Sequence, residues 1–459
     1  MSVNNYDIII IGSGPSGYNA AVRASQIGAK VALIEKSLVG GVCLNHGCIP
    51  TKFLWTVLKR KIEIKKAYEY ALNVNISPIN FKNIVKIKNK NIDNIRKGMI
   101  KVILSYNIDL IYATASLINK NTIMIVENDK RLTYELHAEK IIIATGTQPK
   151  PLTDLLIYDG SKIINSNDIL NIDELPNNML IIGGGPIGIE MATIFSGFGC
   201  NVTLLEYENY LLSKEDIEIS ESIKKNLMRQ GVTVINNCYN KIDQEVSKKK
   251  YDKILVTVGR QPNNNLKLEN IGIKINKLGF IEVDEFCQTN IKNIYAVGDI
   301  TGKHLLAYTA QNDGIIAAIN AVTGNCVTID NSIIPLVVFS MPQSASVKIS
   351  GFSQYKDVSL GKFPFTASVR AILDSERIGF VKCAVDKFSK KPLAFWIFGE
   401  HADEIINVAS QILKSGIKHI QRETIFHPSL SETLLNAYED AFSKCTELTK
   451  KINKIEVQQ

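Results

Sequence analysis

The chain has few cysteines and no long apolar run, and both features limit the class of protein to which it can belong. Its 459 residues include eight cysteines, of which only Cys43 and Cys48 stand close together, separated by four residues. A disulfide framework is therefore excluded as the basis of the fold, and the six isolated cysteines are expected to be buried. Apolar runs such as Ile8–Ile11 have strand length, far short of the ~20 residues of a membrane helix.

Secretion and nucleic-acid binding also lack support. Residues 1–30 contain no basic segment followed by an apolar core and a cleavage site, so we expect a cytoplasmic protein without a membrane partner. The net charge is only +8, and much of the basic surplus lies between Lys59 and Lys101. A surface for an acidic partner or nucleic acid is one explanation. A pair of solvated amphipathic helices is favoured, because no nucleic-acid motif accompanies the lysines.

Residues 6–36 have the pattern of a dinucleotide-binding unit. An apolar run predicts a buried parallel strand, and Gly12, Gly14 and Gly17 follow it with the G-x-G-x-x-G spacing. The first glycine allows the turn, the second lets the backbone approach a pyrophosphate, and the third lets helix and strand pack closely. Glu35 follows Gly17 by eighteen residues, at the end of the next strand, where a carboxylate holds a ribose hydroxyl.

A second unit repeats this arrangement. The run 179–182 leads into Gly183, Gly185 and Gly188, and Glu206 again stands eighteen residues after the third glycine. One such motif is compatible with an ordinary strand–helix turn, but two copies in register indicate two dinucleotide sites. A carboxylate binds a ribose diol and repels a 2′-phosphate, so the second site is expected to prefer NAD over NADP.

The cysteine pair begins eight residues after Glu35, beside the first unit. A zinc site would need further ligands, and His46 is the single candidate close by, so no metal is expected. A structural disulfide would suit an oxidising compartment, which nothing in the sequence indicates. A redox-active pair is therefore favoured, with a structural disulfide as the alternative.

With both units in place, residues 5–440 resemble the pyridine nucleotide–disulfide oxidoreductases. The stretch 40–52 is similar to the redox-disulfide signature of that family. Shorter motifs follow in the family's order: Ala144-Thr145-Gly146, Val258–Pro262, Ile294–Asp299 and His427–Glu432. The resemblance implies an α/β fold with two Rossmann-like dinucleotide-binding domains and a C-terminal α/β dimerisation domain.

The resemblance also implies a division of the chain. The expected parts are an FAD-binding domain over 1–150, an NAD-binding domain over 151–272, a segment over 273–335 that completes the FAD site, and an interface domain over 336–459. The residues expected to bind FAD are Gly12, Gly14, Gly17, Glu35, Lys36, Gly41, Lys52, Ala115, Thr145, Gly146, Asp299 and Ala307. Those expected to bind NAD are Gly183, Gly184, Gly185, Pro186, Gly188, Glu206 and Gly259.

The family pattern assigns catalytic roles as well. Cys43 is expected to exchange with the substrate, and Cys48 to lie nearer the flavin at the start of a helix, which favours a thiolate. His427 is expected to act as the general base and Glu432 to orient its imidazole. Because this pair serves the opposite subunit in the family, a homodimer is implied.

Lys52 and Glu190 match a family ion pair beneath the flavin, where a cation favours the reduced flavin. The cysteine signature and Glu206 are most similar to the family's branch that oxidises dihydrolipoyl groups with NAD⁺. The implied partner is a lipoylated acyltransferase core or a lipoyl carrier protein. Two alternatives stay open: an NAD(P)H-dependent reductase of another small disulfide, and a non-catalytic binding subunit.

Three departures from the family pattern leave substrate fit and partner docking open. His46 replaces a small aliphatic residue, and a change in packing is favoured over an electrostatic effect on the thiols. The other two are Pro186 and the pair Gln343-Ser344.

Overall fold

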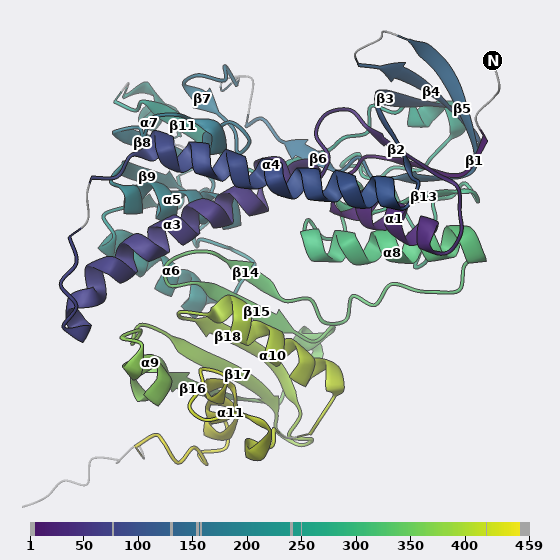
Figure 1. The fold of residues 1–459 in the computed structure, drawn as a ribbon. Helices are drawn as coiled ribbons and strands as arrows, with labels where there is room; N and C mark the ends of the chain where they lie inside the picture. Colours follow the sequence, from purple (N-terminus) through teal and green to yellow (C-terminus); the bar gives the residue numbers. More distant parts are fainter. Residues whose placement is uncertain are drawn as a thin grey trace, which may run out of the picture. The chain divides into compact units, whose positions relative to one another are not determined.

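The computed structural model describes residues 5–75, 78–128, 132–152, 156, 158–238, 242–248, 250–418 and 420–449. They form two compact units assembled from interleaved segments, whose helices and strands are labelled in Figure 1. The first unit comprises 1–57, 78–182 and 251–329, and the second comprises 58–77, 183–250 and 330–459. The α/β class expected from the sequence is confirmed. The four functional parts named above do not coincide with these compact units and stay a prediction.

The first unit contains a sheet in which β1 has parallel neighbours on both sides. Its strands are β1 (Asn5–Ile11), β2 (Val31–Glu35), β3 (Asp109–Asn119), β4 (Thr122–Glu127), β5 (Thr133–Ile143) and β13 (Ile294–Ala296). Ile10 of β1 lies opposite Leu33 of β2 and Ile142 of β5. Residues 8–11 are all buried, which explains why this strand is continuously apolar rather than alternating. The β3–β4 and β4–β5 pairs are antiparallel.

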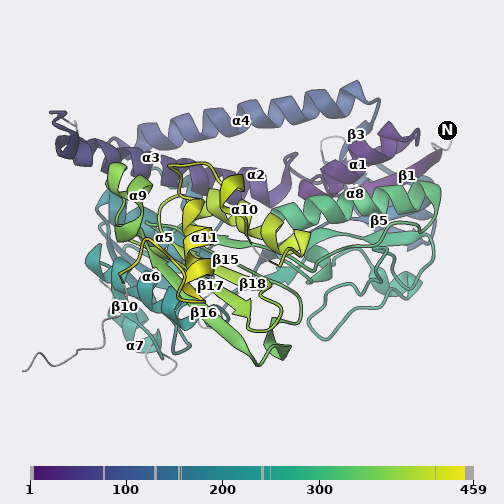
Figure 2. The ribbon, with the colours of Figure 1, turned by 90° about the horizontal axis from the view of Figure 1, so that it is seen from below.

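Helices α1 (Pro15–Gln26) and α8 (Ala307–Thr323) lie side by side in the first unit (Figures 1 and 2). Small residues permit this close approach, since a Cβ at Gly314 would lie 2.1 Å from the carbonyl oxygen of Ser16. The Cys43 and Cys48 segment forms α2 (Gly41–His46) and the start of α3 (Cys48–Lys66). The packing of α1 against α8 therefore fixes the helix that follows the first glycine loop.

The lysine-rich stretch forms α3 and α4 (Phe81–Ser105), as the sequence predicts. Most of its lysines on α4 are exposed, but Lys88 is fully buried. Its Nζ donates to the carbonyl oxygen of Leu170 and lies 3.4 Å from Oδ1 of Asn171. Burial lowers the pKa of Lys88 to about 8. The solvated-face interpretation is therefore wrong for this one lysine, because its ammonium group binds a carbonyl in the interior.

The second glycine-rich segment, residues 183–188, follows a strand of the first unit and precedes a strand of the second unit in the sequence. In the first unit β7 (Ile163–Ile164), β11 (Lys253–Val256) and β8 (Asn178–Ile182) pair in parallel, and β6 (Thr147–Pro149) pairs antiparallel with β12 (Arg260–Pro262). In the second unit β9 (Asn201–Leu205) pairs in parallel with β10 (Thr233–Ile235). The helices here are α5 (Pro186–Phe198), α6 (Ile217–Arg229) and α7 (Ile242–Ser247).

The C-terminal part of the second unit is built on an antiparallel sheet. Its strands, in spatial order, are β14 (Leu336–Val338), β15 (Ser344–Lys348), β18 (Pro392–Phe398), β17 (Phe380–Asp386) and β16 (Val358–Pro364). Helices α10 (Ala402–Ser415) and α11 (Glu432–Asp440) pack on the sheet, and the short α9 (Val369–Leu373) follows β16 (Figure 1). One sheet face, with Cys383 and Phe395, is buried against Ile405 of α10 and Leu434 of α11.

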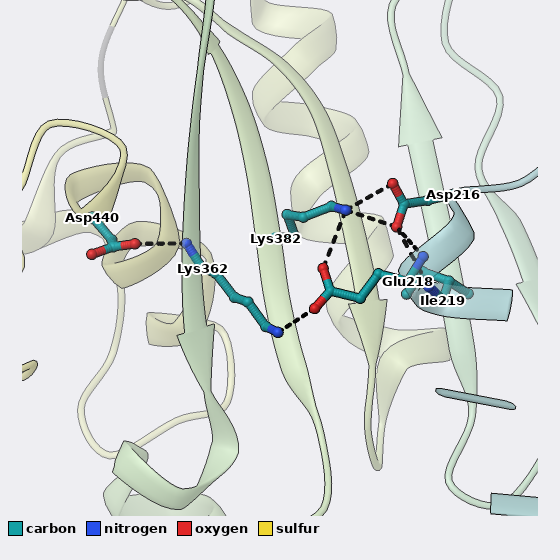
Figure 3. Close-up of polar contacts among 6 residues, drawn as sticks. All are labelled: Asp216, Glu218, Ile219, Lys362, Lys382 and Asp440. Atoms are coloured by element: carbon teal, nitrogen blue, oxygen red, sulfur yellow. Dashed lines mark hydrogen bonds and ion pairs between the residues drawn. The ribbon is translucent and has the colours of Figure 1, made fainter. Parts of the chain in front are cut away.

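Alternation along the strands directs charged residues to the other face of this sheet, where α6 contributes its first turn (Figure 3). Lys382 on β17 donates to both carboxylate oxygens of Asp216 at 2.7 Å and lies 3.3 Å from Glu218. Asp216 also caps α6 by accepting backbone N–H groups. Lys362 on β16 binds Glu218, and its backbone N–H donates to Asp440 of α11 at 2.8 Å. This ion cluster ties α6 to the sheet that carries α11.

Four of the six isolated cysteines are buried, as expected, but Cys326 is exposed and Cys445 is half-buried. Cys326 follows the C-terminal end of α8, where the chain turns at the surface.

No helix among the described residues is both long and apolar enough to cross a membrane. Within the same residues, no group of three or more His, Cys, Asp or Glu side chains is placed to hold a metal ion.

Candidate active site

The two glycine-rich loops have nearly the same backbone geometry. Gly12 has φ 104° and Gly183 has φ 112°, a left-handed conformation that favours glycine. Gly14 and Gly185 then cap α1 and α5 in extended conformations, and each helix begins with a proline. The N-terminus of each helix is therefore presented to its loop in the way that binds a pyrophosphate.

Close packing around the first loop excludes side chains at Gly17 and Gly41. A Cβ at Gly17 would lie 1.8 Å from the carbonyl oxygen of Gly12, and one at Gly41 would lie 2.7 Å from Cα of Gly14. In the second loop, a Cβ at Gly185 would meet no heavy atom of the described residues within 4 Å, which leaves space beside the helix N-terminus. Both loops fit a dinucleotide.

In each unit, the acid predicted to bind ribose is hydrogen-bonded to its own loop. Glu35 Oε2 accepts the backbone N–H of Ser13 at 3.0 Å and its hydroxyl at 2.6 Å. Glu206 Oε2 accepts the N–H of Gly184 at 2.5 Å. The other oxygen of each carboxylate accepts the N–H two residues further along the chain. These bonds hold both carboxylates beside the glycine turns, where a ribose diol would meet them.

The thiol pair spans the junction of two helices. Cys43 lies in α2, Cys48 is the first residue of α3, and Gly47 separates the helices with φ −147° and ψ −110°. The helix predicted to begin after the pair is therefore confirmed. Both cysteines are half-buried. Lys52 stands one turn into α3, on the chain segment that carries the second thiol.

Electrostatics distinguish the two sulfurs. A hydrogen bond with Cys48, followed by burial, raises the pKa of the Cys43 thiol, and Lys52 opposes this rise. Burial lowers the pKa of Arg260, whereas Asp299 and Cys48 raise it. Cys48 therefore lies close enough to Arg260 to interact with its charge, and it stands at a helix N-terminus, which favours a thiolate.

His46 lies between the cysteines at the end of α2 and is half-buried. Burial lowers the pKa of His46, Lys88 and Arg96 lower it further, and Asp168 opposes them. Its buried Nδ1 has no hydrogen-bond partner among the described residues. A neutral imidazole adds no positive charge beside the thiols at neutral pH, which favours the packing interpretation.

Asp299 lies in the one-turn 3₁₀ helix η4 (Gly298–Thr301), directly after β13. Burial raises the pKa of its carboxyl, and a 3.0 Å hydrogen bond from Thr147 Oγ1 and the charge of Arg260 oppose this. Arg260 Nε in turn donates to Thr147 Oγ1 at 2.7 Å, and its Nη2 to the Thr147 carbonyl oxygen at 2.8 Å. Sequence reasoning missed Thr147 and Arg260 as site residues, although both lie in or beside motifs that it singled out.

The turn after β5 is held by a neighbouring segment. Thr145 Oγ1 donates to the carbonyl oxygen of Asn263 at 2.8 Å, and the Asn263 N–H donates to that of Gly146 at 3.0 Å. Gly146 has φ 65°. The first unit thereby brings the glycine loop, Thr145, Gly146 and Asp299 to the ends of adjacent parallel strands, as a flavin nucleotide requires.

The remaining predicted residues have the following positions. Lys36 follows β2, Ala115 is buried on β3, and Ala307 is the first residue of α8. In the second region Pro186 is the first residue of α5, Gly188 is buried on that helix, and Gly259 has φ 115° between β11 and β12. Their assigned contacts with FAD and NAD stay predictions.

Glu190 is buried on α5, where its Oε1 accepts the backbone N–H of Phe339 at 3.1 Å. Lys52 belongs to the first unit and Glu190 to the second. Their predicted ion pair therefore stays a prediction.

The predicted acid–base pair is in direct contact. His427 Nδ1 lies 2.8 Å from Glu432 Oε1, and the other carboxylate oxygen accepts the N–H of Ser429 at 2.8 Å. Glu432 is the first residue of α11 and is 17 % exposed, whereas the His427 side chain is 68 % exposed. The carboxylate thus fixes one ring nitrogen and leaves Nε2 facing outward. An imidazole held in this way, with one ring nitrogen free, suits a general base.

Comparison with known proteins agrees with this geometry. Residues 6–314 match the family model described as pyridine nucleotide-disulphide oxidoreductase, and residues 334–438 match the dimerisation domain of the same family. The dihydrolipoyl dehydrogenase of Geobacillus stearothermophilus is 34 % identical over 458 residues, covering 95 % of this chain and 96 % of that protein. The enzyme of the same name from Chlamydia pneumoniae is 34 % identical over 443 residues, covering 93 % and 95 %.

Solved structures give the same fold. A copper(II) complex of the HOCl-induced flavoprotein disulfide reductase RclA from Escherichia coli has a TM-score of 0.83 at 30 % identity, covering 95 % of this chain and 99 % of that one. LpdA from Mycobacterium tuberculosis has a TM-score of 0.84 at 22 % identity, with the same coverage, and supports the fold alone. Proteins of the matched family bind FAD and a pyridine nucleotide. With its thiol pair, its paired dinucleotide loops and its dimerisation domain, this chain belongs to the pyridine nucleotide-disulphide oxidoreductases.

Proposed function

We propose that this chain is an NAD-linked flavoenzyme that oxidises dihydrolipoyl groups to the cyclic disulfide. The observation that carries the proposal is the exposed His427–Glu432 pair, together with a thiol pair at the junction of α2 and α3. A base that serves a dithiol substrate needs an open face, and His427 has one. Relatives named dihydrolipoyl dehydrogenase, 34 % identical over nearly the whole chain, support the same substrate.

The protein's residues account for the thiol chemistry. With Cys43 and Cys48 oxidised, one substrate thiol gives its proton to His427 of the partner subunit, and the resulting thiolate attacks Cys43 and breaks the bond between the two cysteines. Cys48 leaves as a thiolate, stabilised by the N-terminus of α3 and the field of Arg260. The second substrate thiol then attacks the substrate sulfur bound to Cys43, and its proton passes to the Cys43 sulfur as that sulfur leaves. The oxidised substrate is released, with Cys43 as a thiol and Cys48 as a thiolate.

Electrons leave the cysteine pair through the nucleotide sites. Bound FAD would supply the two-electron chemistry that links the reduced cysteines to hydride transfer to NAD⁺. The first glycine loop, Glu35 and Asp299 would hold the FAD, while the second loop and Glu206 would hold the pyridine nucleotide. Glu206 favours NAD⁺, because its carboxylate already stands at the Gly184 N–H and would repel a 2′-phosphate.

A homodimer completes this scheme. The matched dimerisation domain covers residues 334–438, which include His427 and Glu432. Phe426, next to the base, is 78 % exposed, and an apolar side chain with that exposure beside a catalytic residue suits an interface. The physiological substrate would be the dihydrolipoyl group of an acyltransferase core or of a lipoyl carrier protein.

Turnover with free dihydrolipoamide and NAD⁺ tests the substrate. Purified protein should form NADH with dihydrolipoamide, and no turnover with this substrate would contradict the proposal. The resemblance to RclA, named as a flavoprotein disulfide reductase, supports a second candidate, a reductase of another small disulfide. Comparing lipoamide with other low-molecular-weight disulfides under NADH, as kcat/KM ratios, separates the two candidates.

A further inference from the structure

Arg96 on α4 binds the helix that carries the first redox thiol, a contact that no catalytic step uses. Its Nη1 donates to Oδ1 of Asn45 at 2.8 Å. Asn45 lies in α2, two residues after Cys43 and three before Cys48. Both helices belong to the first unit, and they are in contact. A residue far along the chain therefore bonds a side chain between the two thiols.

The Asn45 amide has a single orientation and little freedom. The residue is only 7 % exposed. Its Nδ2 donates to the carbonyl oxygens of Gly41 at 2.9 Å, Val39 at 3.1 Å and Leu38 at 3.4 Å. Carbonyl groups only accept hydrogen bonds and a guanidinium only donates them, so the amide oxygen must face Arg96. Asn45 thus joins α2 to the loop before it, and Arg96 fixes the other end of the amide.

The loop before α2 is itself fixed against the first glycine loop. Gly40 has φ 98° and donates its N–H to the carbonyl oxygen of Ser13 at 3.0 Å. A Cβ at Gly41 would lie 2.7 Å from Cα of Gly14. Helix α2 begins on this loop and has only six residues, too few to be stable without tertiary contacts. Its placement therefore depends on anchors such as the Asn45 amide.

Helix α4 is a firm support for the Arg96 side chain. It has 25 residues, and its Ile103 is buried in the same core cluster as Val39 of the loop. Arg96 Nη2 lies 2.6 Å from Oδ1 of Asp93, one turn earlier on α4, and the Arg96 side chain is 20 % exposed. This ion pair restricts the guanidinium, so that Nη1 is held toward Asn45.

We propose that Arg96 is a positioning residue for the redox pair, which acts through Asn45 to hold α2 and keep the Cys43 sulfur within reach of Cys48. The inference rests on the redox role of the two cysteines and not on the identity of the dithiol substrate. Disulfide closure within one chain depends on how closely the two sulfurs are held. A charge-assisted hydrogen bond to the buried amide restricts α2 and therefore favours the disulfide over the two thiols.

The equilibrium between the cysteine pair and dithiothreitol tests this role, because this small dithiol needs no specific pocket. Two thiols of one partner are oxidised as the disulfide of the other is reduced, with two electrons and two protons exchanged. Holoenzyme is equilibrated anaerobically with reduced and oxidised dithiothreitol at pH 7.5 and quenched with acid, and the thiols of Cys43 and Cys48 are counted by alkylation and mass spectrometry.

Arg96→Met should lower the equilibrium constant for disulfide formation about tenfold, the loss expected for one charge-assisted hydrogen bond. For a two-electron couple, that corresponds to a rise of about 30 mV in the reduction potential of the pair. In an Asn45→Ala background, the same substitution should change the constant by less than about twofold, because the side chain through which Arg96 acts is gone.

Lys97→Met is the matched control, because Lys97 binds the same Asp93 at 2.8 Å from the next position on α4, and its side chain is 67 % exposed. It should keep the parental equilibrium constant. Thiols are counted only in protein that retains FAD, so loss of folding is not scored as a shift. A parental constant in Arg96→Met would overturn the inference. An equal shift in Lys97→Met would do so too, as would a full tenfold effect in the Asn45→Ala background.

Discussion

Gly314 offers a sharp test of how α1 and α8 support the flavin loop. A Cβ at this position would lie 2.1 Å from the carbonyl oxygen of Ser16 and 2.9 Å from its carbonyl carbon. Favourable contacts between heavy atoms lie at about 3.5–4.0 Å, so Gly314→Ala must separate the two helices by about 1 Å. The obstacle is backbone, which cannot rotate away as a side chain can. The first turn of α1 must therefore move, and the glycine loop with it.

The expected cost combines two opposing effects. Overpacking a well-packed interior costs about 1–3 kcal/mol, and we expect the upper end here because the clash is with backbone. Alanine in place of glycine inside a helix offsets up to about 1 kcal/mol, which leaves a net loss of about 2 kcal/mol. For a unit of this size that corresponds to a fall in melting temperature of about 4–8 °C. Flavin should also dissociate more readily from the displaced loop.

The assay is thermal release of flavin, measured by fluorescence at fixed protein and FAD concentrations because bound ligand shifts the apparent stability. Gly98→Ala in α4 is the matched control, since a Cβ there would meet no heavy atom of the described residues within 4 Å. It should raise stability by about 0.5–1 kcal/mol. Gly314→Ala with a parental melting temperature and parental flavin content would refute the packing argument.

Four further substitutions test other parts of the account. Lys382→Met removes an ammonium group that lies between two acids and whose side chain is 12 % exposed. Hydrogen exchange should show that the free energy of opening α6 falls by about 2 kcal/mol. The more exposed Lys362→Met should lower it by at most about 1 kcal/mol. Cys48→Ser should abolish oxidation of dihydrolipoamide and keep FAD bound; retained turnover would reject the relay. Glu206→Gln keeps an acceptor for its loop but loses the charge, so the kcat/KM preference for NAD⁺ over NADP⁺ should fall about tenfold. Glu432→Gln should lower kcat for dithiol oxidation about 10–100-fold and spare NADH-dependent reduction of an artificial acceptor.

Local patterns predicted the parts of the site that depend on few neighbours. Gly12 and Gly183 were recognisable because strand, turn and helix are adjacent in the sequence, and the structure gives both a left-handed φ. The start of α3 at Cys48 is similarly short-range. Such features follow from spacing, since the residues that make them are at most a few positions apart. The contact between His427 and Glu432 is also short-range, but it was expected from the family resemblance and not from spacing.

The contacts between residues far apart in the sequence were not predicted. Arg260 reaches Thr147 from 113 positions away, and nothing in either motif indicates that pairing. Lys88 has the surroundings of a solvated helix face in the sequence, yet its ammonium group binds a carbonyl 82 positions away. The exposure of Cys326 depends on where α8 ends in space. In each case tertiary packing decides which groups the side chain meets, and neither composition nor periodicity carries information about that packing.

The central claim is that electrons pass from a dihydrolipoyl dithiol through Cys43 and Cys48 to FAD and then to NAD⁺. An anaerobic titration of the purified protein with dihydrolipoamide, followed by flavin absorbance, tests it most directly. The account predicts a change in the flavin spectrum on adding the dithiol, and recovery of the oxidised spectrum with formation of NADH when NAD⁺ follows. A flavin spectrum unmoved by dihydrolipoamide, in protein that NADH reduces normally, would contradict the account.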